Sequence, residues 1–132
     1  MGTYKSVSEA AEFFKGDKFA TTNGMVLEDL GEDYSVCSMV LGENHRNALG
    51  GVMGGVTFTL ADFAFAILSN QIHSPSVAQQ VDIIYLSAPK GTKLTAKAKC
   101  RKSGRTSTVI NVDVVDDTGR DIAQYTAIAH KL

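Results

Sequence analysis

The sequence predicts an α+β fold in which one antiparallel sheet curls around a single long, buried helix. Between Val56 and Leu68 the only charged residue is Asp62, and apolar side chains occupy every side of the helix that this stretch would form. From Val77 onward the apolar residues recur at every second position, which is typical of strands with one buried and one solvated face. Because runs of strands surround one helix, the pattern favours an antiparallel sheet over a parallel, wound one.

Residues 1–41 are expected to form one short helix and a two-stranded hairpin. Ser6–Lys15 has apolar residues at helical spacing, with Ser8 as its cap, and a polar loop follows to residue 24. Met25–Leu30 and Tyr34–Leu41 are predicted strands, joined by a turn at residues 31–33. The helix and loop of residues 1–24 therefore precede the first strand of the sheet.

A helix from about Met53 to Ile72 comes next, and the rest of the chain is predicted as strands. Turn residues at 103–104 and 116–119 join the later strands into an antiparallel meander. The expected strands are Val77–Leu86, Lys93–Arg101, Thr106–Asp116 and Arg120–His130. One sheet cannot fully enclose a helix that is apolar all round, so the apolar surface left over predicts self-association through helices and sheet edges.

Length and composition limit the class of protein. With 132 residues, 44% of them hydrophobic and 20% charged, residues 1–132 are expected to form a single domain with a sizeable core. The net charge of −1 gives no reason to expect nucleic acid as a partner, and no apolar run is long enough to span a membrane. Cys37 and Cys100 lack metal-ligand spacing and are expected to be reduced thiols. The sequence thus predicts a cytoplasmic protein with no metal and no cofactor.

The segment from His45 to Asp62, HRNALGGVMGGVTFTLAD, carries the candidate chemistry. An ionised carboxylate is costly to bury without a partner, so Asp62 needs an explanation that its apolar neighbours do not. Glycines just before a helix leave backbone N–H groups uncovered, and the positive helix end favours developing negative charge there. These glycines are Gly50, Gly51, Gly54 and Gly55. A polar loop, a bare helix N-terminus and one buried acid are the parts of an acyl-transfer site.

Eight positions of this segment match a known pattern in register, in which H-x-N-x-x-G-x-x-H-G-G precedes a helix containing L-A-D. They are His45, Asn47, Gly50, Gly54, Gly55, Leu60, Ala61 and Asp62. The match continues at Tyr85-Leu86, at Gly91–Leu94 and at the Gly104-Arg105-Thr106 turn. In these residues the chain resembles the hotdog-fold acyl-CoA thioesterases, specifically their PaaI-type (phenylacetate-degradation) branch. The resemblance implies a hotdog fold and hydrolysis of an acyl-CoA thioester to a carboxylic acid and free coenzyme A.

The resemblance also implies roles for individual residues. Asp62 would act as general base or as nucleophile, a choice that stays open, and its apolar surroundings are expected to raise its pKa. The Gly54 N–H would stabilise the oxyanion, while Asn47 would orient the thioester carbonyl or the attacking water. Substrate contacts are expected from His45, Gly55, Tyr85, Gly104, Arg105, Thr106 and Ser107.

The two ends of the substrate call for different surroundings. The turn at residues 104–107 offers a cation, hydroxyl groups and open backbone, which suit the phosphates and the polar arm of coenzyme A. The acyl group is expected in a pocket lined by Phe58, Phe63 and Phe65 or by their copies in a partner chain.

The spacing of Gly54 and Asp62 predicts a site shared between two chains. Eight residues of helix separate them by about 12 Å at roughly 1.5 Å per residue. An oxyanion donor and the group that drives attack must both come within about 3 Å of one reacting centre. Two antiparallel copies of the helix would bring Gly54 of one chain beside Asp62 of the other. The family places its sites at such a dimer interface, and in this branch the dimers pair into a tetramer.

Two departures from the family pattern keep other functions open. Met53 stands where the pattern usually has histidine, and Ala78 stands where many relatives carry serine or threonine. These changes motivate an alternative, a non-catalytic acyl-CoA-binding hotdog domain. A hotdog hydratase or dehydratase is a third possibility, although those enzymes use a histidine with an acid.

Overall fold

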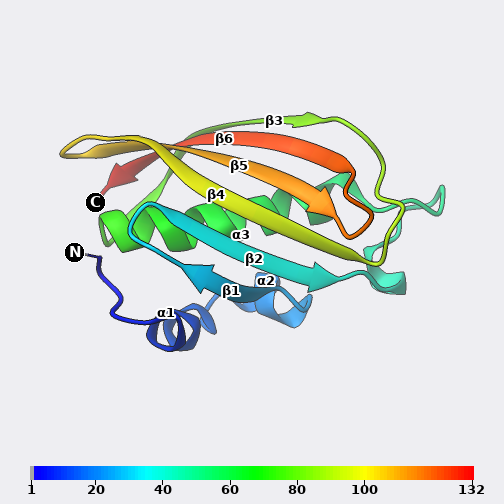
Figure 1. Ribbon diagram of the computed structural model, residues 1–132, viewed down its shortest axis with the longest axis horizontal. Coiled ribbons are helices and arrows are strands. Elements are labelled where there is room, and N and C mark those ends of the chain that lie inside the picture. Colours follow the sequence, from blue (N-terminus) through cyan, green and yellow to red (C-terminus); the bar gives the residue numbers. More distant parts are fainter. Residues whose placement is uncertain (1) are drawn as a thin grey trace.

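The computed structural model describes residues 2–132, and its elements follow the predicted order (Figure 1). Two short helices, α1 (Val7–Phe14) and α2 (Lys18–Thr22), precede the hairpin of β1 (Val26–Leu30) and β2 (Tyr34–Val40). A single 3-10 turn, η1 (Glu43–His45), leads toward the long helix α3 (Gly54–Ile72). The remaining strands are β3 (Ser76–Tyr85), β4 (Lys93–Ser103), β5 (Ser107–Asp116) and β6 (Asp121–Lys131).

The six strands form one antiparallel sheet in the order β1-β2-β4-β5-β6-β3. Strands β4, β5 and β6 form the predicted meander, whereas β3 pairs with β6 at the far edge of the sheet. Figure 1 shows α3 running along the sheet, and it contacts every strand from β2 to β6. The predicted α+β architecture, an antiparallel sheet curled around one long helix, is confirmed.

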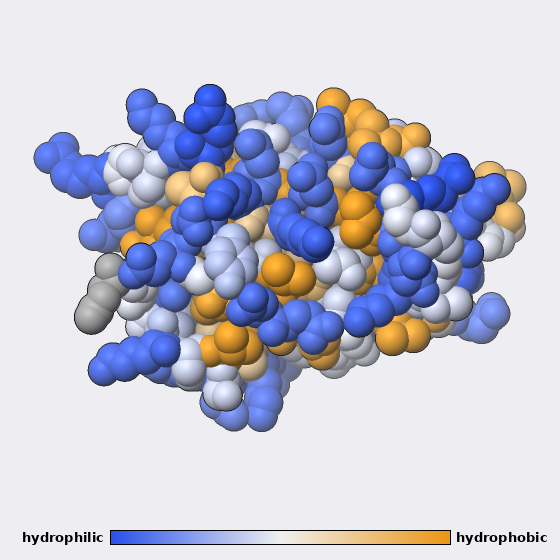
Figure 2. All heavy atoms as spheres, viewed as in Figure 1, coloured by the Kyte–Doolittle hydropathy of each residue, from blue (hydrophilic) through white to orange (hydrophobic). Residues whose placement is uncertain are grey.

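Alternation along the strands places one face of the sheet against α3. The inward side chains of β4 and β5 are Leu94, Ala96, Ala98, Thr108, Ile110, Val112 and Val114, all of them buried. On β4 they alternate mostly with charged residues, and the view in Figure 2 shows mostly hydrophilic side chains over the surface with hydrophobic ones between them. The period-two pattern of the sequence therefore identified the core face correctly.

Helix α3 is buried on most sides but not on all. Its sheet-facing residues are buried, including Leu60, Ala61, Ala64, Ile67 and Leu68. A second stripe, here called the open stripe, is only half-buried and consists of Gly55, Thr59, Asp62, Ala66 and Asn70. These positions recur at intervals of three or four residues, so they share one side of the helix. Among residues 2–132 no helix combines the length and hydropathy needed to cross a membrane.

The N-terminal region differs from the prediction in two details. Ser6, not Ser8, caps α1: its Oγ accepts a hydrogen bond of 3.0 Å from the Glu9 N–H, and Glu9 accepts one from the Lys5 N–H. The expected polar loop contains the five-residue helix α2. A helix this short spans little more than one turn, which is too little for a hydrophobic period to appear in the sequence.

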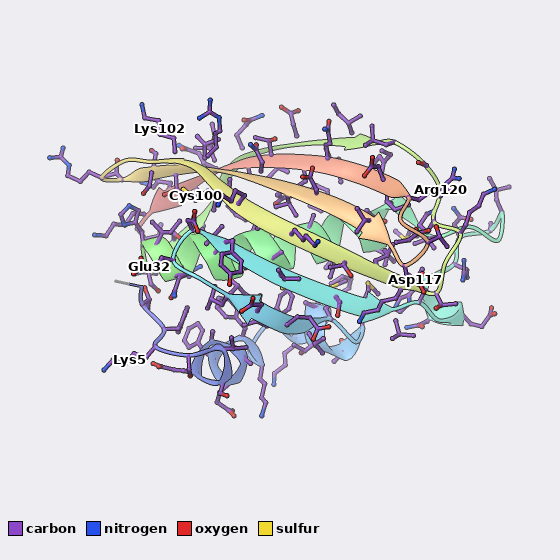
Figure 3. All side chains as sticks on the ribbon, in the orientation of Figure 1. Lys5, Glu32, Cys100, Lys102, Asp117 and Arg120 are labelled. Carbon is purple, nitrogen blue, oxygen red and sulfur yellow. The ribbon has the colours of Figure 1, made fainter. Side chains whose placement is uncertain are left out.

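Two aspartates fasten the connection between β3 and β4 to the turn between β5 and β6. Asp116 is buried, and its carboxylate accepts hydrogen bonds from the N–H groups of Lys90, Gly91, Thr118 and Arg120 and from the Thr118 hydroxyl. Asp117 accepts further bonds from residues 92 and 93. Figure 3 labels Asp117 and Arg120 at this end of the sheet. The loop that follows Tyr85 is thus fixed in place.

Candidate active site

Asp62 is the acid at the centre of the candidate site. It lies half-buried on the open stripe of α3, and the Tyr125 hydroxyl donates a hydrogen bond of 2.9 Å to its Oδ1. Burial raises the pKa of Asp62, and the bond from Tyr125 opposes that rise. Burial and the neighbouring carboxylate raise the pKa of Tyr125, so its hydroxyl keeps its proton as a donor. The carboxylate is therefore oriented, partly desolvated and a stronger base than an ordinary aspartate.

A pocket of about 260 Å³ opens beside Asp62, here called the acid pocket. Helix α3 contributes Thr59, Asp62 and Phe63 to its wall, and residues 17–20 at the start of α2 form the other side. Asp17 in that wall has a raised pKa, first because of burial and second because of the charge of Asp62. Asp17 was not among the predicted site residues, since neither α2 nor its position against α3 could be seen in the sequence.

The N-terminus of α3 presents free backbone donors. No side chain caps the helix, and within residues 2–132 the N–H groups of Gly54 and Gly55 have no hydrogen-bond partner. The N–H of Met53, one residue earlier, donates to the His45 carbonyl at 2.9 Å. Two adjacent free N–H groups at the positive end of a 19-residue helix can bind an oxyanion.

Tyr85 lies directly over Gly54. Its hydroxyl donates a hydrogen bond of 3.0 Å to the Gly54 carbonyl oxygen, and a Cβ at position 54 would lie 3.2 Å from the tyrosine ring. Glycine at this position therefore permits close packing as well as an open N–H. A second hollow, of about 330 Å³, is lined by Gly54, Tyr85 and the loop that follows β3.

Asn47 and His45 shape the loop that leads to α3. The Asn47 Oδ1 accepts bonds from the N–H groups of Leu49 and Gly51 at 3.0 and 3.1 Å, which closes the loop tip. Its Nδ2 donates no hydrogen bond within residues 2–132 and remains exposed to solvent. The buried His45 accepts a bond from the Gly42 N–H at Nδ1, while its Nε2 is buried without a partner in the same range. Both residues hold the loop, and the Asn47 amide keeps a donor available.

The turn at residues 104–107 lies at the opposite end of α3 from Gly54. Its Gly104 carbonyl accepts a hydrogen bond of 2.7 Å from the His73 ring, just beyond the helix C-terminus, and Gly104 N–H donates to the Ser107 carbonyl. Lys102, which precedes the turn, is labelled at that end in Figure 3. Nineteen residues of helix correspond to about 28 Å. A single chain therefore does not bring this turn to the Gly54 donors.

The three phenylalanines expected around the acyl group have different surroundings in the single chain. Phe58 and Phe65 pack against the ring of Tyr125, with centroids 5.5 and 6.0 Å apart, and Phe65 is fully enclosed in the core. Phe63 lines a hollow, the acid pocket. The predicted acyl pocket, which allowed for copies of these residues from a partner chain, stays a prediction.

Metal binding has no candidate residues in the described part of the chain. Within residues 2–132 no group of three or more histidine, cysteine, aspartate or glutamate side chains lies close enough to hold an ion. The thiol of Cys37 is buried and that of Cys100 half-buried, and neither forms a disulfide.

Comparison with known proteins identifies the family of this chain. A family model described as the thioesterase superfamily matches residues 49–123, more than half of the chain. The chain belongs to the thioesterase superfamily. This thioesterase is 36% identical over 93 residues to acyl-coenzyme A thioesterase 13 of Homo sapiens, covering 67% of this chain and 66% of the relative. It is 26% identical over 131 residues to acyl-coenzyme A thioesterase PaaI of Escherichia coli, covering 98% and 94% of the two chains.

Solved structures agree with this assignment. The structure of the E. coli PaaI protein matches this thioesterase with a TM-score of 0.88 at 26% identity and covers 96% of each chain. A hypothetical thioesterase protein from Streptococcus pneumoniae, solved with coenzyme A, matches with a TM-score of 0.81 at 27% identity over 89% of this chain and 94% of that one. The predicted hotdog fold and PaaI type are confirmed, and the enzyme is a thioester hydrolase.

Proposed function

We propose that this enzyme hydrolyses an acyl-CoA thioester to a carboxylic acid and free coenzyme A, with Asp62 driving the attack. The observation that carries the proposal is the Asp62 carboxylate, which is partly desolvated and held by the Tyr125 hydroxyl at the edge of a pocket. A carboxylate with a raised pKa is a better base at neutral pH than an exposed one. The names of the relatives, both acyl-coenzyme A thioesterases, supply the substrate class.

Asp62 has two chemical routes to the same products. As general base it takes a proton from water as the water oxygen attacks the thioester carbonyl; the tetrahedral intermediate then expels the coenzyme A thiolate, which takes up the proton. As nucleophile its oxygen attacks the carbonyl directly, expels the coenzyme A thiolate and forms an anhydride that water then hydrolyses. In both routes the Tyr125 hydroxyl fixes one carboxylate oxygen and leaves the other for the reaction.

The free N–H of Gly54 is the proposed oxyanion donor, with the Gly55 N–H beside it. Negative charge on the carbonyl oxygen would form at the positive end of α3, where the helix dipole and the two donors act together. Asn47 would direct its exposed Nδ2 at the carbonyl or the water. His45 supports this arrangement by accepting the Met53 N–H bond, which sets where α3 begins. Tyr85 fixes Gly54 from the other side.

The complete site is proposed to form between two copies of the chain. Gly54 and Asp62 lie eight residues apart on one straight helix, about 12 Å along its axis, so they cannot both reach one carbonyl carbon. The open stripe of α3 and the edge strand β3 are the surfaces left for a second copy. Antiparallel helices would also bring the 104–107 turn of one chain toward the Gly54 end of the other. Pairing of such dimers would give the tetramer.

In that arrangement the Gly104–Ser107 turn would hold the polar arm of coenzyme A. The side chains of Arg105, Thr106 and Ser107 are exposed at the tip of the β4–β5 hairpin, and a guanidinium can pair with a phosphate through two hydrogen bonds. The thioester end would be the only buried part of the substrate.

Thiol release from a panel of short, medium, long and aryl acyl-CoAs, measured with a chromogenic thiol reagent, tests the proposed function. We expect turnover of at least one class by the wild type and a loss of about 10²-fold or more for Asp62→Asn. Binding without thiol release by a folded wild-type protein would instead support a non-catalytic acyl-CoA-binding domain.

The Arg105→Ala variant tests the assignment of the coenzyme A arm within the same panel. It should raise KM by a similar factor for every acyl group and weaken the dependence of KM on salt, because the lost contact is to phosphate. A loss confined to one acyl class would show that Arg105 contacts the acyl group.

A further inference from the structure

A third hollow, here called the apolar pocket, lies beside the N-terminus of α3. It encloses about 160 Å³, and α2, its following loop and the first turn of α3 form its walls. The lining residues are Phe19, Asn23, Met25, Met53, Gly55, Val56 and Thr59. Phe19 and Thr59 also line the acid pocket, so the two hollows adjoin along the open stripe between Gly55 and Asp62.

Two polar side chains in the wall of the apolar pocket already hydrogen-bond to the backbone, and the free Gly55 N–H is assigned to the oxyanion. The Thr59 hydroxyl donates to the Gly55 carbonyl at 2.7 Å, and the Asn23 Nδ2 donates to the Phe19 carbonyl at 2.9 Å. The thioether of Met53 stands where the family pattern usually has histidine, and it offers only weak hydrogen bonding. A hydroxyl group placed here would lose its water and find little in exchange.

The apolar pocket is positioned for the acyl end of a thioester. Met53 and Gly55 flank Gly54 in sequence and both line the pocket, so a carbonyl bound at the Gly54 N–H would have the pocket at its side. The hollow beneath Tyr85 differs in that hydroxyl-bearing residues, Thr57 and Ser87, belong to its lining. The pocket volume is close to the ~150 Å³ of an apolar cavity that holds one benzene molecule.

We propose that the apolar pocket binds the acyl group and that Phe19 and Met53 set the acyl specificity; this inference rests on the proposed function. Phe19, which lines the pocket from α2, limits the acyl chain to about six carbons, a size equivalent to one ring. Met53 makes the pocket reject acyl groups that carry a hydroxyl near the thioester. The preferred substrate class is therefore an unsubstituted acyl-CoA of medium length.

Values of kcat/KM for hexanoyl-CoA, dodecanoyl-CoA and 3-hydroxyhexanoyl-CoA test the proposal in the wild type. We expect hexanoyl-CoA to exceed each of the other two by about tenfold or more, in line with the discrimination that apolar pockets achieve. Equal values for all three substrates would overturn it.

Replacement of Phe19 tests the length limit, with Phe13 as a matched control. Both phenylalanines are largely exposed, 71% and 63%, but Phe13 lies on α1 and lines neither pocket. Phe19→Ala should raise the dodecanoyl-to-hexanoyl ratio of kcat/KM by about tenfold, and Phe19→Leu should raise it less. Phe13→Ala should leave the ratio unchanged. Because both side chains are exposed, circular dichroism is expected to show folded variants; an unchanged ratio in folded Phe19→Ala would refute the role of Phe19.

Met53→Gln tests the discrimination against hydroxyl groups. Glutamine has nearly the shape of methionine and adds a donor and an acceptor, so it should narrow the gap between hexanoyl-CoA and 3-hydroxyhexanoyl-CoA by about tenfold. The dodecanoyl-to-hexanoyl ratio should not change, which separates this effect from a general loosening of the pocket. An unchanged gap between the two substrates in the folded variant would overturn the role of Met53.

The proposed function and the pocket assignment can fail separately. If the wild type released no thiol from any acyl-CoA, the proposed function itself would fail. If turnover were observed but did not respond to replacement of Phe19 or Met53, only the pocket assignment would be refuted.

Discussion

At the scale of single residues, Asp62 combines a functional advantage with a cost in stability. Burial raises its pKa, so the folded state binds a proton more tightly than the unfolded chain does. Between the unfolded and the folded pKa the native state therefore holds more protons, and the free energy of unfolding decreases as pH rises through that window. Each unit of pKa elevation corresponds to about 1.4 kcal/mol at neutral pH.

Asp62→Asn should accordingly be more stable than the wild type at pH 7 while losing activity. Asparagine keeps an oxygen to accept the Tyr125 hydrogen bond and removes the buried charge. Thermal unfolding at neutral pH should show a higher Tm for the variant, and the difference should vanish below the unfolded pKa of about 3.9, where Asp62 is neutral in both the folded and the unfolded wild type. A variant less stable than the wild type at pH 7 would contradict a net cost of the charge.

Tyr125→Phe should shift the pH dependence of the reaction. The hydroxyl lowers the pKa of Asp62, so its removal raises that pKa and moves the acid limb of the kcat/KM profile to higher pH. The phenylalanine ring keeps the contacts with Phe58 and Phe65. Tyr34→Phe is a matched control, because it removes a tyrosine hydroxyl bonded to a different carboxylate, that of Asp29, on β1 and β2. The acid limb of the kcat/KM profile should shift in Tyr125→Phe and stay in place in Tyr34→Phe.

At the scale of elements, strong sequence periods were predictive and short elements were not. The apolar run that became α3 and the alternation of β4 and β5 fixed the core face, since burial imposes those periods. Helix α2 has too few residues to show a hydrophobic period, so the sequence did not predict it. The positions of Phe19 and Asp17, which line the pockets, could therefore not be predicted either. The pairing of β3 with β6 was equally hidden, because register across a sheet depends on tertiary packing.

The candidate site was predictable where it follows one continuous segment. The loop from His45 onward leads directly into the helix that carries Gly54 and Asp62. Because helix geometry is regular, the spacing of these two residues and their surroundings could be predicted from the sequence. Tyr125, which orients Asp62, lies 63 positions away on β6 and has no local signal. The contact between Phe58 and Tyr125 was hidden for the same reason, because it joins α3 to a distant strand.

The connection between β3 and β4 owes its fixed position to Asp116. Hydrogen bonds from the Thr118 hydroxyl and from backbone N–H groups lower the pKa of this carboxyl, so its stabilisation is complete above the unfolded pKa of about 3.9 and is lost as pH falls through the folded value. Asp116→Asn turns an N–H₂ toward backbone donors and should lower Tm at pH 7, with the gap to wild type closing in strong acid. Asp113→Asn, an exposed neighbour on β5, should have little effect. A Tm difference that stays constant at all pH values would exclude the Asp116 charge as the cause of the lost stability.

At the scale of the whole molecule, one edge of the sheet and one side of the helix are left uncovered by the elements of residues 2–132. Strand β3 is an edge strand on which Val77, Ile84 and Tyr85 are exposed, and the open stripe of α3 carries Asp62. Natural proteins rarely leave an apolar edge strand unprotected, so both features favour a second copy of the chain. The same second copy would complete the site by adding Gly54 to Asp62.

Co-expression of two differently tagged chains, one with Asp62→Ala and the other with Gly54→Pro, tests this shared site. Proline fits the first position of α3, because the backbone of Met53 is extended and proline is tolerated where no helical N–H bond is made. It removes the proposed oxyanion donor, whereas the control Gly54→Ala adds a Cβ near Tyr85 but keeps the N–H. Each homodimer would lack a working site, but a heterodimer would combine the intact Gly54 of one chain with the intact Asp62 of the other.

Doubly purified heterodimers should therefore recover about half of the wild-type activity, since one of their two symmetric sites is intact. The single-variant homodimers should stay inactive, and Gly54→Ala should retain more activity than Gly54→Pro because it keeps the donor. If Gly54 and Asp62 of one chain served the same site, heterodimers would hold no intact site and would be as inactive as their parents. Recovery of activity on pairing is the result that only a site built from two antiparallel copies of α3 predicts.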